Sequence, residues 1–162
     1  MSNGEIKFSM SIPCDADGFL RRECPTCERE FKVLPTPDGE IPVPVQGGGY
    51  FCPYCSVQAS SWWTTAQREL ALSLTKSRVV DPIMKKFSDD IGRIGRDSRG
   101  IISAKVNYPS GPEPQPLAET EDMVRFDFNC HPSEPVKVLD GWTGTVHCII
   151  CGGAAAISSL DS

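Results

Sequence analysis

Cysteines are the residues of this chain best able to do chemistry, and six of the eight occur in CxxC pairs. "CPTC" and "CPYC" are separated by 24 residues, a loop rich in proline and glycine. Each CxxC turn points two sulfurs at one ion, and zinc prefers four such ligands in a tetrahedron. The sequence therefore predicts a structural zinc ion held by Cys24, Cys27, Cys52 and Cys55.

A second set of ligands lies in the C-terminal part, where "FNCHPSEP" is followed by "VHCIICG". Ser133 stands where a CxxC pair would have its second cysteine, so three thiolates need a fourth ligand. Histidine binds zinc through a neutral ring nitrogen, and we expect His131 to do so here. The alternatives are His147, a water molecule that leaves an open and catalytic position, or no metal. The expected second set is Cys130, His131, Cys148 and Cys151.

The two cysteine-bearing segments also repeat one another. "CEREFKV" matches "SEPVKV", and "YFCPYCS" matches "VHCIICG". In these motifs the chain resembles the zinc-ribbon superfamily, whose turns are rubredoxin-like knuckles, present in two copies. The resemblance implies two zinc ions per chain, but it implies no particular activity, because a fold does not specify a function.

The elements that position these ligands are short strands and a helical pair. Alternating stretches predict strands at "EFKVL", "IPVPV", "MVRFDF", "EPVKVL" and "GTVHCI". Apolar residues at Trp63, Ala66, Leu70 and Leu74 predict a helix over residues 62–79. Thr64 and Gln67 resemble a capping box at its start.

A second helix is predicted over residues 82–95. Asp81 would be its N-cap, and Pro82 would occupy the first helical position. The apolar stripe of this helix is formed by Ile83, Phe87, Ile91 and Ile94.

The expected fold class is a small metal-stabilised α+β protein in which two zinc ribbons flank the helical pair. Its predicted divisions are an N-terminal ribbon over residues 1–60, a helical segment over 61–105, a proline-rich linker over 106–122 and a C-terminal ribbon over 123–162.

Composition narrows the class of function. No apolar stretch is long enough to span a membrane, and "MSNGEIKFSMSIP" lacks the features of a secretory signal. We therefore expect a cytoplasmic protein whose cysteines stay reduced. The net charge is −5, with −3 over residues 1–67, +4 over 68–105 and −6 over 106–162. This distribution does not favour nucleic-acid binding by the chain as a whole.

These observations favour a non-enzymatic zinc-binding protein that acts as a metal-stabilised module for binding another protein. No catalytic residue is expected: Cys14 belongs to no pair, and each CxxC has partners for a metal rather than the setting of a redox thiol. The alternative is nucleic-acid binding through the basic segment 68–105, with Arg93, Arg96 and Arg99 as contacts.

Overall fold

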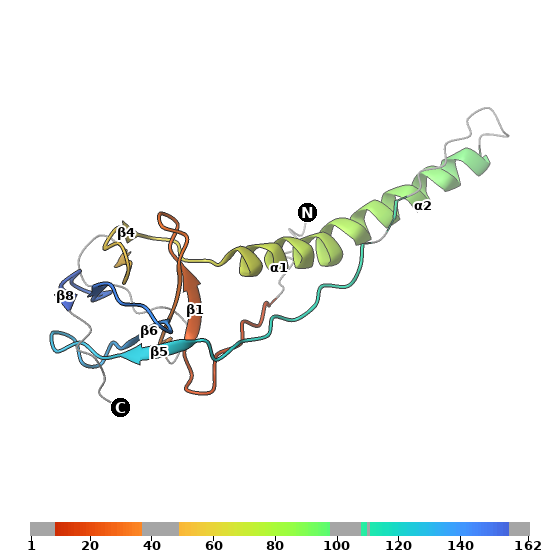
Figure 1. Ribbon diagram of the computed structural model, residues 1–162. Helices are drawn as coiled ribbons and strands as arrows, with labels where there is room; N and C mark the ends of the chain where they lie inside the picture. The colour runs from red at the N-terminus through yellow and green to blue at the C-terminus, as the bar shows by residue number, and fades with distance from the viewer. Residues whose placement is uncertain (1–8, 37–48, 98–107, 110, 156–162) are drawn as a thin grey trace. The chain divides into compact units, whose positions relative to one another are not determined.

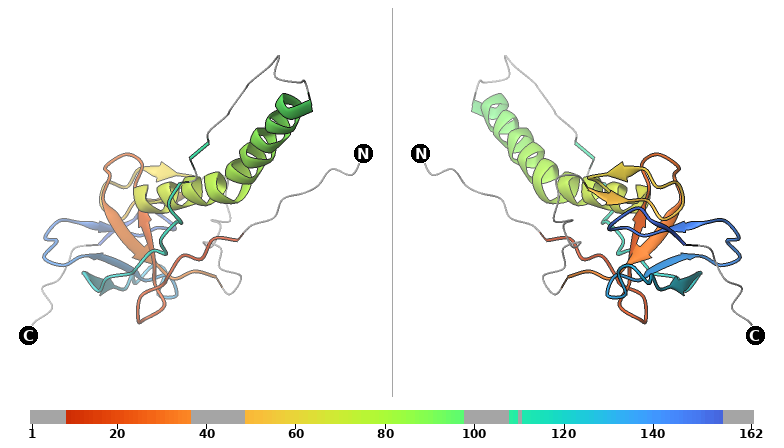
Figure 2. Two further views of the ribbon diagram at one scale, coloured as in Figure 1. Left: turned by 90° about the vertical axis from the view of Figure 1, so that its right-hand side faces the viewer. Right: turned by 90° about the vertical axis from the view of Figure 1, so that its left-hand side faces the viewer.

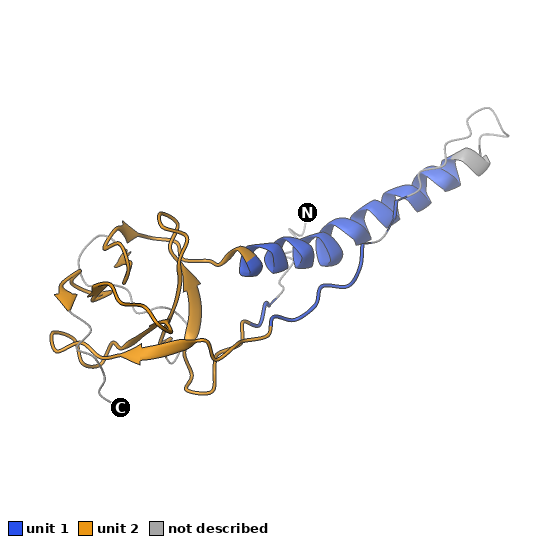
Figure 3. Ribbon diagram, viewed as in Figure 1, with its two compact units in different colours: residues 1–11, 66–117 blue, residues 12–65, 118–162 orange. Residues whose placement is uncertain are grey.

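The computed structural model describes residues 9–36, 49–97, 108–109 and 111–155 (Figure 1). The chain divides into two compact units, coloured separately in Figure 3. Unit 1 comprises Met1–Ser11 and Ala66–Leu117, and unit 2 comprises Ile12–Thr65 and Ala118–Ser162. Both cysteine-bearing segments thus belong to unit 2, whereas the sequence suggested separate ribbons. The predicted linker over 106–122 is divided between the two units.

Unit 2 is built on one antiparallel sheet to which both ribbons contribute. The strand order is β1-β2-β6-β5, formed by Leu20–Glu23, Glu30–Val33, Val136–Leu139 and Met123–Phe126. The lysine–valine strands of the two repeats, β2 and β6, pair directly, with Lys32 opposite Lys137. The two copies of the sequence repeat therefore meet where β2 pairs with β6, and this pairing is called the central seam below.

Two short hairpins carry the return knuckles. One consists of β3 (Tyr50–Phe51) and β4 (Gln58–Ala59), and the other of β7 (Val146–His147) and β8 (Ala154–Ala155). Four of the five predicted strand stretches thus contain a strand. The fifth, "IPVPV", lies outside the described residues.

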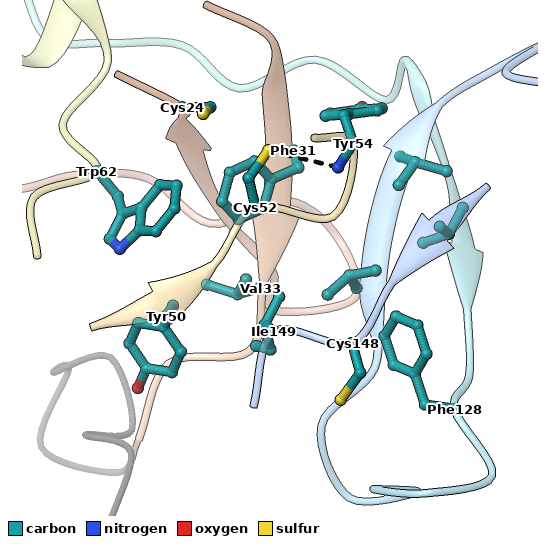
Figure 4. Close-up of a cluster of buried hydrophobic side chains, with 13 residues drawn as sticks. Cys24, Phe31, Val33, Tyr50, Cys52, Tyr54, Trp62, Phe128, Cys148 and Ile149 are labelled. Atoms are coloured by element: carbon teal, nitrogen blue, oxygen red, sulfur yellow. Dashed lines mark hydrogen bonds between the residues drawn. The ribbon is translucent and has the colours of Figure 1, made fainter. Parts of the chain in front are cut away.

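Among the described residues, one apolar core contains side chains from both cysteine-bearing segments, which are called the first and second ribbon below (Figure 4). Phe31 and Val33 come from the first ribbon, and Val136 and Phe128 come from the second. The core also contains fully buried thiols, which are those of Cys24, Cys52 and Cys148. Since each large apolar side chain contributes about 1.5–3 kcal/mol when it is buried, the ribbons stabilise one another.

The adjacent tryptophans have different environments. Trp62 is 4% exposed and meets the ring of Phe31 edge-on, with the centroids 5.5 Å apart. Trp63 is 42% exposed, and the guanidinium of Arg22 lies over its ring at 5.9 Å from the centroid. Only Trp62 therefore belongs to the core.

Charged side chains are buried beside the central seam. Lys32 has a fully buried side chain and Lys137 a nearly buried one, and the carboxylate of Asp15 accepts hydrogen bonds from both ammonium groups. Lys32 also pairs with Glu119, at 3.0 Å. Burial acts to raise the pKa of Asp15, but the hydrogen bonds from Lys137, the Phe19 amide and Lys32 lower it to about 2. The two opposed lysines are thus neutralised within the fold.

The helical region is one continuous helix, so the predicted helical pair is wrong. It comprises α1 (Thr65–Thr75), a π-helical turn (Lys76–Val80) and α2 (Asp81–Asp97), as Figure 2 shows. Asp81 has helical dihedral angles and donates its N–H to the carbonyl of Lys76, so it is no N-cap. The π turn directly precedes Pro82, whose ring would clash with the carbonyl four residues before it in a regular α-helix.

Residues 108–109 and 111–117 run back along the helix, from Asp81 past Lys76 to Ala66. Tyr108 hydrogen-bonds Asp81, the first residue of α2. Gly111 lies so close to Lys76 that a Cβ atom added to the glycine would be 3.4 Å from the ammonium nitrogen. Leu117 lines a shallow groove together with Ala66 of α1. Leu70 of the first predicted stripe lines the same groove, and both Leu70 and Leu74 are buried. Among the described residues, no helix is long and apolar enough to cross a membrane.

The apolar residues of α2 have a different environment. Ile83, Phe87 and Ile94, which are called the α2 stripe below, are exposed by 56%, 54% and 63%. A helix whose apolar side is bare usually contacts another molecule, because water solvates such a surface poorly.

Candidate metal centres

The first cysteine cluster has the geometry of a tetrahedral metal site. It gathers one sulfur from each of Cys24, Cys27, Cys52 and Cys55, all within 4.8 Å of one another. Two of the Sγ–Sγ distances, Cys24–Cys55 and Cys27–Cys52, are 3.7 Å. A tetrahedron with Zn–S bonds of about 2.3 Å has edges of about 3.8 Å. These two distances match that edge, and the four sulfurs could hold a metal ion such as zinc.

Local backbone geometry fixes the sulfurs of this cluster. In each knuckle the residue after the second cysteine donates its N–H to the carbonyl of the first, Glu28 to Cys24 and Ser56 to Cys52, at 2.9 Å. This closure requires a positive φ, which is 58° at Glu28 and 57° at Ser56. Further N–H groups, including that of Tyr54 on Cys52, point at the sulfurs. The CxxC sequence thus builds half of a metal site by itself.

The second cluster contains His131. Cys130, His131, Cys148 and Cys151 offer ligand atoms that all lie within 4.8 Å of one another. The Sγ atoms of Cys130 and Cys151 are 3.6 Å apart, and Nδ1 of His131 is 3.4 Å from Sγ of Cys148. A tetrahedral zinc with Zn–S of 2.3 Å and Zn–N of 2.0–2.1 Å separates sulfur from nitrogen by about 3.6 Å. These four donors fit a metal ion as well.

His147, the alternative fourth ligand, lies elsewhere. Its backbone N–H donates to the carbonyl of Pro53 at 2.8 Å, and its Nδ1 lies 3.2 Å from the same oxygen. Because the side chain contacts the opposite ribbon, it is not part of the cluster in which His131 lies.

The two knuckles are hydrogen-bonded to each other in a reciprocal way. The N–H of His147, just before Cys148, donates to Pro53 in the first return knuckle. The N–H of Phe51, just before Cys52, donates to Ile149 in the second, at 2.9 Å. Each metal cluster therefore supports the backbone that positions the other.

Burial and hydrogen bonding act on these thiols in opposite directions. Burial raises the pKa of Cys148 to about 11. At Cys24 burial also acts to raise the pKa, but N–H groups of Cys27 and Thr26 lower it overall. The N–H of Gly153 lowers the pKa of Cys151. Since each thiol must lose its proton to bind a metal, binding releases protons and weakens as the pH falls.

A third group of potential ligands, formed by Asp15, Asp17 and Glu121, already contains a cation. The ammonium of Lys137 lies 2.7 Å from the carboxylate of Asp15, 2.5 Å from that of Asp17 and 3.7 Å from that of Glu121. The lysine thus takes the place that a metal ion would occupy.

The lone Cys14 is exposed and belongs to neither cysteine cluster. Partial burial and the charges of Asp15 and Glu119 raise its pKa. It is therefore mainly a protonated thiol at neutral pH, which is a weak nucleophile.

The candidate nucleic-acid contacts are only partly described. Arg93 is exposed on α2 and lies 3.8 Å from the carboxylate of Asp90. The side chain of Arg96 and the whole of Arg99 lie outside the described residues.

Sequence reasoning did not identify the acidic residues that lie near the buried lysines. Glu119 and Asp122 belong to a stretch that was expected to be linker, yet both pair with Arg21 and Lys32 of the sheet. The acidic run "ETED" was the available signal.

Comparisons with profiles of protein families, with curated proteins and with solved structures gave no match to this chain. The two clusters fit zinc-ribbon-like metal sites, and that conclusion comes from their own geometry.

Replacing His131 by alanine is expected to lower the number of bound zinc ions from two towards one, because the second cluster loses its only nitrogen donor. Replacing His147 by alanine should leave two ions, since the backbone bond to Pro53 remains. Native mass spectrometry of the two purified variants measures both counts. The opposite pattern would assign the fourth position to His147.

Proposed function

We propose that this protein is a non-enzymatic, cytoplasmic zinc-binding protein with two zinc ribbons, each holding one ion, that presents a surface for binding another protein. The observation that carries the zinc assignment is the pair of four-donor clusters, one with four sulfurs and one with three sulfurs and an imidazole nitrogen. Thiolate and imidazole donors in tetrahedral sets favour zinc over the harder cations.

Closed coordination supports a structural role. Structural zinc sites have four protein ligands, whereas catalytic zinc keeps one position for water or substrate. Both clusters offer four protein donors, so neither leaves the open position that a catalytic metal needs. The zinc ions would then stabilise the fold and leave recognition to the surface.

The α2 stripe is the surface that we assign to the partner. Ile83, Phe87 and Ile94 lie on one side of α2, because their spacing of four and seven residues is close to whole turns of the helix. Lys85 and Asp89 project from the opposite side, and both are exposed. Stripes of this kind bind apolar grooves or helices of other proteins.

Charge favours a protein over a nucleic acid at this surface. Positive and negative residues are balanced in α2 up to Arg93. The described charged residues there are Asp81, Lys85, Lys86, Asp89, Asp90 and Arg93. The described part of α2 therefore has no net positive charge to attract phosphates.

The zinc assignment is tested by native mass spectrometry of protein purified without chelator. Two zinc ions per chain support it, and a chain without metal contradicts it.

The surface is tested by placing a photo-crosslinking amino acid at position 87 and, as a matched control, at position 85 in cells. We expect a discrete adduct with another protein from position 87 only, and its loss when Ile83→Glu and Ile94→Glu are added. Lys85→Glu and Asp89→Lys, on the opposite side, should leave the adduct unchanged. Equal adducts from both positions, or an adduct of twice the mass of the chain, would exclude the proposed partner surface.

A further inference from the structure

The two metal clusters differ in their access to solvent. In the first, Cys24 and Cys52 are fully buried, while Cys27 and Cys55 are partly buried. In the second, only Cys148 is buried, and both Cys130 and Cys151 are exposed. A solute in water therefore reaches two sulfurs of the second cluster, those of Cys130 and Cys151, more readily than any sulfur of the first cluster.

The exposed pair is also placed for a reaction between its members. The Sγ atoms of Cys130 and Cys151 are 3.6 Å apart, so a modest movement brings them to the length of about 2 Å of a disulfide bond. As ligands of a zinc ion, both cysteines would be present as thiolates. Thiolate character and exposure are the properties that make cysteines susceptible to peroxides.

We propose that Cys130 and Cys151 form a site of reversible oxidation by hydroperoxides, and that their oxidation releases the metal ion of the second cluster while the first keeps its own. This inference rests on the zinc binding proposed above. One thiolate attacks the peroxide, the O–O bond breaks, and a sulfenic acid and an alcohol or water form. The second thiolate then attacks that sulfur, and water leaves as the disulfide forms.

The stoichiometry of this step is balanced. The two sulfurs lose two electrons, the hydroperoxide gains them, and two protons are taken up from water. With hydrogen peroxide the products are one disulfide and two water molecules. A disulfide sulfur is no longer a thiolate ligand, so only Cys148 and His131 remain, and two donors bind zinc much more weakly than four.

The test uses the zinc-loaded full-length protein, treated with hydrogen peroxide in the absence of reductant. Native mass spectrometry follows the zinc count, and peptide mapping follows the thiols. We expect one ion to leave at least about tenfold faster than the other, because exposed thiolates oxidise first. A Cys130–Cys151 disulfide should appear with it, and dithiothreitol with added zinc should restore the second ion.

Two variants serve as controls. Cys14→Ser removes the other exposed cysteine and should leave the release of zinc unchanged. Cys130→Ser should prevent the disulfide to Cys151. Simultaneous loss of both ions, earlier oxidation of the first cluster, or a Cys148–Cys151 disulfide would each overturn the proposal. A chain that holds no zinc before peroxide is added would instead contradict the proposed zinc binding, and the two failures are thereby distinguished.

Discussion

Replacing Cys24 and Cys27 by serine is expected to abolish the binding of both zinc ions, not only of the one that these residues hold. A structural zinc site contributes roughly 10–16 kcal/mol of apparent binding free energy, and this is also folding free energy. The net stability of a domain is only about 5–15 kcal/mol. Unit 2 should therefore not remain folded when its first cluster is lost.

We expect the second cluster to depend on the first, because the described residues of both cysteine-bearing segments share one buried apolar core. Cys24 and Cys52 lie in the same buried group as Val136, Val138 and Cys148. The reciprocal bonds between the return knuckles add backbone connections across the seam. Loss of the second cluster should be less damaging, because two of its four donors lie at the surface.

Native mass spectrometry and thermal unfolding of the double variant measure this dependence. With two equivalents of zinc per chain, the zinc count is expected to fall from two to zero, and the cooperative unfolding transition should be lost. Cys14→Ser is the matched control and should retain two ions, since Cys14 lies in neither cysteine cluster. A double variant that keeps one tightly bound ion would show that the ribbons fold independently.

Replacing Asp15 by asparagine is expected to lower the free energy of unfolding by about 3–5 kcal/mol, the usual effect of removing one partner of a buried ion pair. Asp15 accepts from Lys32 and from Lys137, whose side chains are 0% and 4% exposed. A neutral amide at position 15 would remove the negative charge that offsets part of the repulsion between the ammonium groups of Lys32 and Lys137.

Urea unfolding of the zinc-loaded variant measures this effect. Asp17→Asn is the matched control, because Asp17 also pairs with Lys137 but its side chain is 67% exposed. We expect this control to lose no more than about 1 kcal/mol, as is usual for exposed pairs. Equal losses of unfolding free energy in the two variants would show that the buried Asp15 contributes no more than the exposed Asp17.

Features that depend on local spacing could be predicted from the sequence. Each CxxC turn closes on itself through hydrogen bonds between neighbouring residues, so its two sulfurs converge wherever the turn lies in the fold. Short alternating stretches likewise predicted β2, β5, β6 and β7, whereas β1, β3, β4 and β8 lie outside the predicted stretches. Helix formation across most of residues 65–97 also followed from local periodicity.

Predictions from local sequence patterns were wrong for the start of α2 and for the segment that follows the helix. Asp81 and Pro82 favour the start of a new helix, yet a π turn carries the helix through them. The segment expected to be a linker runs along α1 and then contributes Glu119 to the buried ion pairs of the sheet.

The way in which the two repeats meet could not be predicted from local patterns. Spacing in the sequence does not reveal that β2 pairs with β6, and that pairing is what places Lys32 against Lys137 and buries both. It also separates the two histidines: the exchange of hydrogen bonds between ribbons holds His147 on Pro53, while His131 remains beside the sulfurs. Contacts between residues about a hundred positions apart depend on the packing of a common core, which no local pattern specifies.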